Sequence, residues 1–385
     1  MKFEDRFDWS LFFILCCFAA VSCVALLSAQ ESNQYSDNFV VKQLIWYGVG
    51  GVAIGVMMLF DPEDYRKLSP YLYGFGLLLL GALILAPSSI APIIKGQKSW
   101  FVLPGLGSMQ PAELVKIFTI LMLGNITTLH HEKFQKGTVK LDFWLLFKLV
   151  GITALPLALI MQQPDLGTSL VFIAIMSGMI LISGIRWRII LPLFLTIAGI
   201  GSSILWLVIK SPELLDKYLH VKQYQLGRIY AWLQPERFQD AAGYQLIKAM
   251  KAIGSGQLLG KGFGDREVYL PESQTDFIFS IIGEEYGFLG SCVVLLLFFF
   301  LIYRLTNIAN SSNDDFSSYV MVGIISMISF HVFQNVGMSV QLLPITGIPL
   351  PFISYGGSAL LGNLISMGIA FAIYFHRKTY MFGDD

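Results

Sequence analysis

The sequence predicts an all-α protein with ten membrane-spanning helices, from its composition, its long apolar runs and the charges between them. Of its 385 residues, 55% are hydrophobic and only 14% are charged, with a mean hydropathy of +0.64. A soluble domain carries roughly 25% charged residues, so this chain has too few to cover a water-facing surface. Soluble enzymes, disordered chains and secreted disulfide scaffolds are thereby excluded. A net charge of zero gives no case for a nucleic-acid partner.

Ten segments approach the roughly 20 apolar residues that a helix needs to cross a bilayer core of about 30 Å. We expect them at residues 10–29, 42–60, 70–88, 110–129, 143–162, 166–184, 187–209, 280–303, 317–338 and 355–375. The first resembles a signal peptide, but the acidic residues before it and its long apolar run favour an uncleaved span. The fourth is the least apolar, because it contains Glu113 and Lys116.

Lys and Arg are distributed unequally between the loops, which predicts the orientation. With the N-terminus in the cytoplasm, twelve of them fall in inner segments: Lys2, Arg6, Arg66, Lys67, Lys133, Lys136, Lys140, Arg186, Arg188, Arg304, Arg377 and Lys378. Only Lys42, Lys95 and Lys98 fall in the short outer loops. Because basic residues stay on the cytoplasmic side, we expect both termini there.

The chain is expected to form a single membrane domain over 1–385, with a large extracytoplasmic loop at 210–279 between spans seven and eight. Loops of this length are usually functional or disordered. Aromatic and apolar residues favour order in this one: Tyr224, Tyr230, Trp232, Leu246 and Tyr269. We expect helices in it, for example over 244–253, that lie on the outer membrane surface. Two shorter outer loops, at 89–109 and 339–354, are rich in Gly and Pro.

A glycine-rich run in the long loop, GSGQLLGKGFG at 254–264, resembles a phosphate-binding loop only superficially. A P-loop has four residues between its first Gly and a Gly-Lys pair, which Ser or Thr then follows. Here the spacing differs, and Gly262 follows Lys261. We therefore favour a tight turn, whose amides could still hold a lipid-linked phosphate.

Glu113 and Lys116 are three residues apart in the fourth span, so they share a helix face and can pair. Each charge costs about 2.5–3.5 kcal/mol in the membrane, and pairing offsets part of that cost. Two interpretations stand equally: a structural pair that fixes helix packing, and a pair that lines a polar cavity. His331, in the ninth span, is interpreted as a hydrogen-bonded core residue rather than a ligand.

Asp276 lies where the long loop re-enters apolar sequence. Partial burial raises the pKa of a carboxylate and suits a general base. The alternative is an N-cap, because an Asp at a helix start usually has that role. Glu284 and Glu285 follow about two turns later and favour a functional cluster.

The outer loops contain further candidates. Asp165, in a very short outer turn, could simply cap the sixth span. Lys95 and Lys98 could bind an anionic headgroup, whereas Trp100 is more typical of an interfacial belt. The SYGGS sequence at 354–358 opens the last span, and its small residues permit close approach of a helix or a ligand.

Several of these segments resemble the SEDS family of bacterial cell-wall glycosyltransferases, in family order over most of the chain. The matching pieces are GQKSWF (96–101), QPAELVKI (110–117), QPDLGTS (163–169), AIGSG (252–256), LGKG (259–262), TDFIF (275–279), GEE (283–285) and PLPFISYGGS (349–358). The GIPLP form at 347–351 and the short termini resemble the elongation branch of the family more than its division branch.

The resemblance implies a multi-pass protein of the bacterial inner membrane that polymerises lipid II into β-1,4 glycan strands on the extracytoplasmic side. It implies a class B penicillin-binding protein as partner within an elongation complex, no organic cofactor, and room for a divalent Mg²⁺ or Mn²⁺ ion. By this resemblance, the catalytic Asp of the family corresponds to Asp276. The expected substrate-binding set is Trp100, Lys98, Glu113, Lys116, Asp165, Arg228, Lys261, Glu284, Glu285, Ser354, Gly356 and Gly357.

Two other functions use the same features. A lipid II flippase would need polar groups at mid-membrane depth, whereas the candidates here gather near the outer face. A scaffold for the elongation complex would leave Asp276 without a role.

Overall fold

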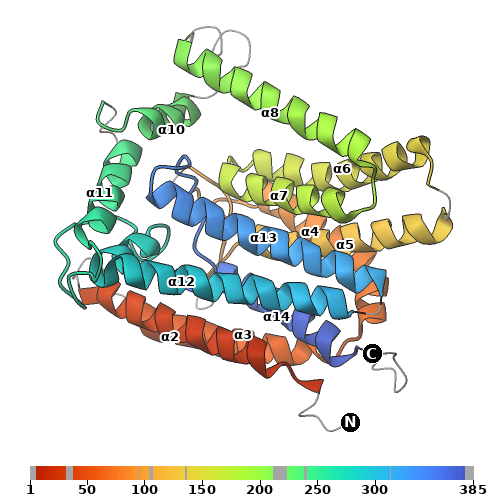
Figure 1. The fold of residues 1–385 in the computed structure, drawn as a ribbon, viewed down its shortest axis with the longest axis horizontal. Helices are drawn as coiled ribbons and strands as arrows, with labels where there is room; N and C mark the ends of the chain where they lie inside the picture. Colours follow the sequence, from red (N-terminus) through yellow and green to blue (C-terminus); the bar gives the residue numbers. More distant parts are fainter. Residues whose placement is uncertain are drawn as a thin grey trace.

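The computed structural model describes residues 6–31, 38–94, 96–103, 107–134, 137–210, 223–237, 241–312 and 314–377. The helices in these residues are α2 (Trp9–Glu31), α3 (Phe39–Met57), α4 (Pro62–Leu85), α5 (Pro111–Lys133), α6 (Val139–Met161), α7 (Leu166–Ile182), α8 (Trp187–Lys210), α10 (Gln223–Leu233), α11 (Ala241–Ser255), α12 (Ile278–Ser311), α13 (Asp315–Ser339) and α14 (Gly357–Phe375). A short antiparallel hairpin joins β1 (Phe101–Leu103) to β2 (Gly107–Met109). The all-α fold class is confirmed, and the helices run alongside one another as a bundle (Figure 1).

Each of the ten predicted spans coincides with a helix. Among the described residues, nine helices are long and apolar enough to cross a membrane, which makes this a multi-pass membrane protein. The remaining helix, α7, has 17 residues, a rise of roughly 26 Å and the lower limit for a span. The count of ten therefore stays a prediction.

The predicted limits of the third span were wrong by about two turns. Helix α4 begins at Pro62 rather than at residue 70, because Asp61 and Asp64 form a reciprocal capping box around its first turn. This arrangement satisfies N–H groups that the start of a helix otherwise leaves unpaired. The charged stretch before residue 70 concealed that start from a search for apolar residues.

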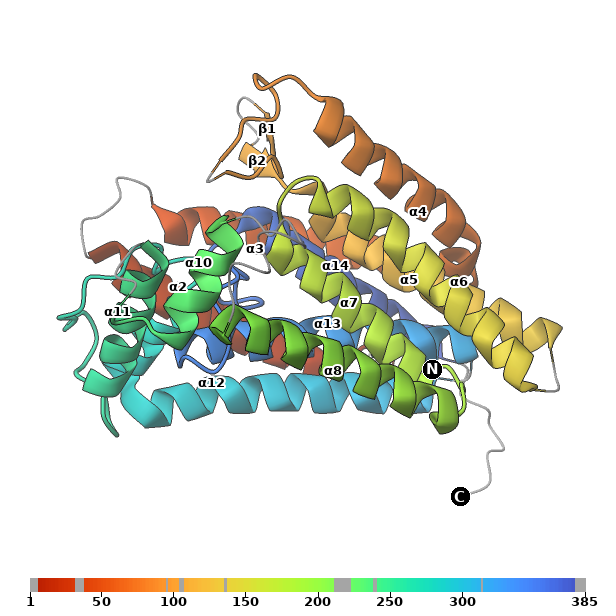
Figure 2. The same ribbon diagram turned by 90° about the horizontal axis from the view of Figure 1, so that it is seen from above.

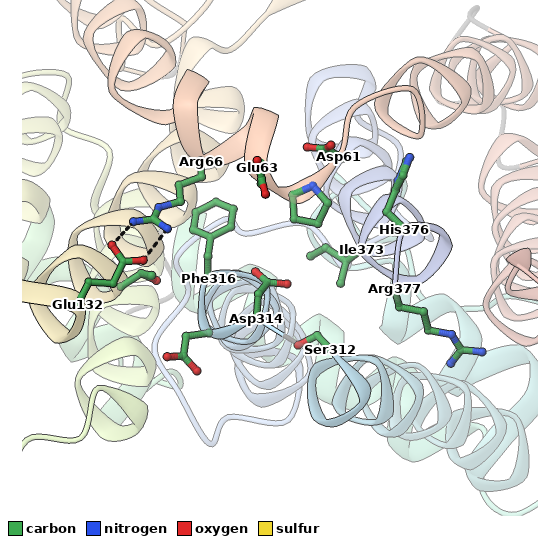
Figure 3. A pocket seen from close by; sticks show the side chains of 13 residues that line it. Asp61, Glu63, Arg66, Glu132, Ser312, Asp314, Phe316, Ile373, His376 and Arg377 are labelled. Atoms are coloured by element: carbon green, nitrogen blue, oxygen red, sulfur yellow. Dashed lines mark hydrogen bonds and ion pairs between the residues drawn. The ribbon is translucent and has the colours of Figure 1, made fainter. Parts of the chain in front are cut away.

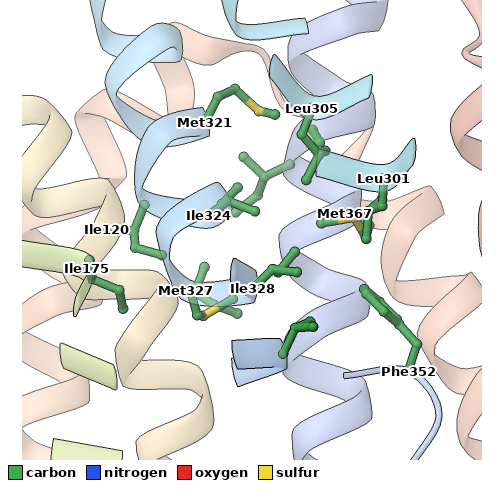
Figure 4. Packing of buried hydrophobic residues seen from close by; sticks show 14 of the residues in the cluster. Ile120, Ile175, Leu301, Leu305, Met321, Ile324, Met327, Ile328, Phe352 and Met367 are labelled. Atoms are coloured by element: carbon green, nitrogen blue, oxygen red, sulfur yellow. The ribbon is translucent and has the colours of Figure 1, made fainter. Parts of the chain in front are cut away.

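Helix α13 lies at the centre of the bundle, where it contacts α5, α7 and α12. Its buried apolar residues pack against those of four other helices (Figure 4). The labelled members of this core are Met321, Ile324, Met327 and Ile328 of α13, with Ile120, Ile175, Leu301, Leu305, Phe352 and Met367 around them. This packing gives α13 a fixed position from which its polar residues can hold neighbouring segments.

Helix α8 lies at the edge of the bundle (Figures 1 and 2). Only Ile190 and Val208 of this helix are buried, while apolar side chains such as Leu195 and Trp206 are largely exposed. An apolar helix with so little burial is suited to contact with lipid.

The two ends of the bundle differ in what they contain. Phe7, before α2, stacks on Phe371 near the end of α14, with ring centroids 5.2 Å apart. The described N- and C-terminal residues therefore share one end, here called the termini end, as predicted. The opposite end, where α12 begins, is called the Asp276 end.

The long loop contains helices α10 and α11, and the predicted helical stretch 244–253 lies within α11. Helix α11 packs against α12 and α10. Leu246 and Ala249 of α11 are fully buried in a small apolar cluster with Phe277 and Met338. These contacts attach the loop firmly to the Asp276 end. Its position on a membrane surface stays a prediction.

Candidate active site

Asp276 lies in the turn before α12, half-buried at the end of the bundle. The side-chain amide Nδ2 of Asn335, on α13, donates to the Asp276 carbonyl at 2.7 Å and to the Ile348 carbonyl at 2.8 Å. The N-cap of α12 is Phe277, and no side chain caps the first turn. The alternative that Asp276 serves as the N-cap is therefore wrong.

The Asp276 carboxylate faces Gly347. A Cβ atom on Gly347 would lie 3.3 Å from Asp276 Oδ2, and the residue has a φ of +73°. L-residues rarely adopt this left-handed conformation, so glycine is required on two grounds. The backbone at Gly347 thus forms one wall of the space in which the carboxylate sits.

Ser354 ties the turn of Asp276 to the loop before α14. Its hydroxyl donates to the Thr275 carbonyl at 2.6 Å and accepts from the Leu350 N–H at 2.8 Å. One residue further, the Tyr355 N–H donates to the Gln274 carbonyl at 2.9 Å. Ser354 is buried, and both hydrogen bonds of its hydroxyl are made with backbone groups. Its predicted contact with substrate is not tested by these contacts and stays a prediction.

The two glycines at the start of α14 permit close helix contact. Gly356 is the N-cap of the helix, and Gly357 lies against the indole of Trp46 on α3. A Cβ atom on Gly357 would come within 2.3 Å of that ring. Of the two interpretations of these small residues, close approach of a helix is thus present at Gly357. Close approach of a ligand stays a prediction.

Glu113 and Lys116 form the predicted ion pair, with 2.8 Å between Lys116 Nζ and Glu113 Oε2. Both side chains are buried, 9% and 2% exposed respectively. The ammonium also lies 3.2 Å from Nε2 of His331 on α13. The pair is therefore part of a three-residue polar group, and His331 is the hydrogen-bonded core residue that the sequence predicted.

Asp165 caps α7, as the simpler interpretation predicted. Its carboxylate accepts from the Thr168 N–H at 3.0 Å and from the Thr168 hydroxyl at 2.8 Å. It also accepts from Gln110 Nε2, just before α5, at 3.0 Å. Next to it, a Cβ atom on Gly167 would lie 2.9 Å from the Thr346 carbonyl oxygen. Asp165 thus connects the start of α7 to the start of α5, and Gly167 beside it packs against the loop that contains Gly347.

Lys98 is held by the end of α4, since its ammonium donates to the carbonyls of Ile84 at 2.8 Å and Ala86 at 2.5 Å. Basic side chains commonly satisfy the last carbonyls of a helix in this way. Trp100 is half-buried beside β1, and Lys95 lies outside the described residues. The predicted headgroup contacts of Lys98 and Trp100 stay predictions.

Arg228, on α10, lies close to the loop that contains Gly347. Its guanidinium lies 3.5 Å from the Ile345 carbonyl, two residues from Gly347. The helix is fixed there by a reciprocal pair: Trp232 Nε1 donates to the Gln341 carbonyl at 2.9 Å, and Gln341 Nε2 donates back at 3.0 Å. The structure therefore brings Arg228 close to the segment that faces Asp276.

The glycine-rich run packs against the first turns of α12. The N–H groups of Lys261 and Gly262 donate to the carbonyls of Glu284 and Glu285, at 3.1 and 3.0 Å. A Cβ atom on Gly260 would lie 2.0 Å from the Glu285 carbonyl oxygen. The run is a tight turn, as predicted, and two of its amides are already engaged, so these two do not hold a phosphate.

Glu284 and Glu285 contact the glycine-rich loop and α2. Glu284 Oε1 accepts from Lys261 Nζ at 2.8 Å and from the Glu267 N–H at 2.9 Å. Burial lowers the pKa of Lys261, but its ion pairs with two glutamates outweigh burial and hold the pKa above its usual value. Glu285 accepts from a serine hydroxyl of α2 and lies 3.5 Å from Arg266 Nε. These contacts are those of a structural clamp beside the site.

Asn335 was not predicted as a site residue. One Asn in a long apolar helix matches no motif, although its position four residues after His331 places both on one face of α13.

The sequence also gives no sign of a pocket of about 530 Å³ at the termini end. Charged side chains from α4, α5, α13 and the end of α14 line it (Figure 3), with Arg66 and Glu132 joined at 2.8 and 2.5 Å. This pocket lies at the end of the bundle opposite Asp276.

Within the described part of the chain, no three His, Cys, Asp or Glu residues gather as a metal site. The expected Mg²⁺ or Mn²⁺ ion stays a prediction, as does the expected lack of an organic cofactor.

The chain is similar to proteins of the FtsW/RodA/SpoVE family, described as cell cycle proteins, over residues 6–379. It is 36% identical to "Stage V sporulation protein E" of Bacillus subtilis (strain 168) over 337 residues, covering 86% of this chain and 85% of the relative. It is 31% identical over 394 residues to "Probable peptidoglycan glycosyltransferase FtsW" of Coxiella burnetii, covering 98% and 100%.

Solved structures share the fold. A chain of a structure described as "Structural coordination of polymerization and crosslinking by a peptidoglycan synthase complex" aligns with a TM-score of 0.78 and 25% identity, covering 96% of this chain and 97% of that one. The rod shape determining protein RodA of Thermus thermophilus aligns with a TM-score of 0.69 and 25% identity, covering 97% and 98%.

Proposed function

Because the chain belongs to the SEDS family, which includes FtsW, RodA and stage V sporulation protein E, we propose that it is a peptidoglycan glycosyltransferase that polymerises lipid II. The observation that carries this proposal is the Asp276 carboxylate beside Gly347. Its backbone is held by a buried amide of α13. A carboxylate fixed in this way at the end of a membrane bundle is suited to accept a proton from a substrate held at the membrane surface.

In the proposed reaction, Asp276 acts as the general base. Its carboxylate accepts the proton of the 4-hydroxyl on the acceptor sugar as that oxygen attacks the anomeric carbon of the donor. The bond from that carbon to the lipid diphosphate breaks, and its electron pair leaves with the diphosphate. Attack from the opposite face inverts the anomeric carbon and forms a β-1,4 link. The donor carries its own leaving group, so no sugar nucleotide is needed.

The departing diphosphate needs positive charge near it. Four cations were candidates: Lys98, Lys116, Arg228 and Lys261. Position favours Arg228, because its guanidinium lies beside the loop that faces Asp276. A guanidinium has five N–H donors and can contact a phosphate while it keeps a carbonyl partner. A divalent ion would add charge at the diphosphate, and no step here depends on it.

The proposal places the site on the extracytoplasmic side of a bacterial inner membrane, as the distribution of Lys and Arg predicts. It includes a class B penicillin-binding protein as partner, and a similar fold in a peptidoglycan synthase complex supports that part. The elongation role rests on the GIPLP sequence at 347–351, while the two sequence relatives compared above are described as stage V sporulation protein E and FtsW.

Purified protein in liposomes, supplied with labelled lipid II, Mg²⁺ or Mn²⁺ and a class B penicillin-binding protein, provides the test. We expect long glycan chains with β-1,4 links, and less product without the partner. Transfer of lipid II between leaflets without any polymer, from verified folded protein, would contradict the proposal and favour a flippase.

A further inference from the structure

One face of α13 connects the intramembrane ion pair to the turn of Asp276. His331 and Asn335 are one helical turn apart on this face, and they are 4% and 0% exposed. His331 contacts Lys116 on one side, at 3.2 Å. Asn335 donates to the Asp276 carbonyl on the other, at 2.7 Å. The ion pair of α5 and the turn before α12 therefore both contact a single helix.

The donors and acceptors in these contacts determine which side-chain atoms of His331 and Asn335 the contacts leave unused. The Lys116 ammonium has only donors and is held by Glu113 at 2.8 Å. His331 Nε2 must then accept, and the ring proton resides on Nδ1 as a donor. Asn335 uses its Nδ2 for two donations, which leaves Oδ1 as an acceptor.

These two remaining atoms are complementary. Among the residues that the structure describes, His331 Nδ1 and Asn335 Oδ1 are both buried without a hydrogen-bond partner. Side chains one turn apart on a helix have Cβ atoms about 5–6 Å apart, which is roughly the span of two hydrogen bonds through one water molecule. Buried polar atoms are nearly always satisfied, and ordered water commonly supplies the missing contact.

We propose that a buried water joins His331 Nδ1 to Asn335 Oδ1, and that both are positioning residues coupling the Glu113–Lys116 pair to the Asp276 backbone. This inference rests on the proposed function, because it concerns the position of Asp276 as the proposed general base. Neither side chain touches the reacting atoms. Their effect passes through α13, which packs in the apolar core. A change at the ion pair alters the position of His331 and Asn335, and therefore that of the Asp276 backbone to which Asn335 donates.

The first test needs no activity. Full-length protein labelled with ¹⁵N-histidine in lipid nanodiscs is examined by NMR, and the signal absent from His331→Gln is assigned to His331. We expect a neutral ring with its proton on Nδ1. A ring protonated on Nε2, or on both nitrogens, would overturn the proposal, because Nε2 could then not accept from Lys116.

The second test measures glycan polymerisation. Removing a buried hydrogen bond to a charged group costs about tenfold or more in an equilibrium or rate. We expect His331→Leu to lower kcat at least about tenfold, while KM for lipid II changes less than about twofold. His331→Gln keeps an acceptor for Lys116 and a donor for the water, and should recover most of the rate. Met327→Leu, one turn away on α13 and apolar, is the matched control and should keep wild-type kcat.

A double-variant cycle separates coupling from simple destabilisation. If His331 acts through Lys116, His331→Leu should have little further effect in a Lys116→Met background. Additive losses, or equal kcat for the Leu and Gln variants with unchanged melting temperatures, would contradict the proposal. If wild type itself makes no glycan, the proposed function has failed, and the NMR result still decides the hydrogen-bond network.

Discussion

Gly347→Ala is the substitution that most directly probes how the Asp276 carboxylate is placed. The added Cβ would lie 3.3 Å from Asp276 Oδ2, tighter than ordinary van der Waals contact, so the carboxylate must move by a few tenths of an ångström. The φ of +73° adds strain, because an L-residue in the left-handed region costs about 1–2 kcal/mol. A displacement of about 1 Å at a reacting group can cost about a hundredfold in rate. We therefore expect about a tenfold loss of kcat.

The matched control is Gly184→Ala, at the termini end. Gly184 has a similar φ of +76°, and its added Cβ would meet only His131, at an ordinary 3.5 Å. Both variants should lose a similar 1–2 kcal/mol of stability, measured as a shift in melting temperature in detergent. Only Gly347→Ala should lose polymerisation of lipid II. Full activity in Gly347→Ala, or equal loss in both variants, would refute the argument.

Three further predictions follow from contacts near the site. Ser354→Ala removes two buried hydrogen bonds to backbone and should destabilise the protein by about 2–6 kcal/mol, since each of the two buried groups left unpaired costs about 1–3 kcal/mol; an unchanged melting temperature would contradict this. Arg228→Gln should lower kcat for lipid II without changing the melting temperature; equal kcat would assign the diphosphate to another cation. The raised pKa of Lys261 means that its pairing stabilises the fold fully below its unfolded pKa of about 10.5 and is lost as pH rises through the higher folded pKa. Thermal stability should therefore fall above about pH 10.5, and Lys261→Met should remove that part of the fall; an identical pH dependence in the variant would disprove the assignment.

The helical bundle could be predicted because apolar length is a local property of the sequence. Each expected span coincides with a helix for that reason. The limits depend on other features: the capping box of Asp61 and Asp64 starts α4 two turns before its apolar part. Helix α12 continues to Ser311 across a break at Gly287, where φ is +61°. Neither feature changes the mean hydropathy of the apolar segment, which is the property by which a span is recognised.

The site was predicted only in part, because motifs identify residues and not their partners. Asp276 was selected as a candidate from its position at the edge of an apolar run. Asn335, which holds it, is 59 residues away in the chain and has no motif of its own. The positive charge of Lys98 led us to expect a contact with a lipid headgroup. In the structure, its ammonium donates to carbonyls at the end of α4. That geometry depends on where a neighbouring helix ends, which composition does not encode.

Polymerisation of lipid II by Asp276→Asn is the decisive measurement, because Asp276 is the proposed general base. The reaction would be run beside wild type and Asp265→Asn, a variant of an exposed carboxylate in the same loop region, with the class B partner present and melting temperatures matched. The account predicts long glycan from wild type and from Asp265→Asn, and none from Asp276→Asn. Glycan from Asp276→Asn at near wild-type rate would contradict it and assign proton transfer to another group.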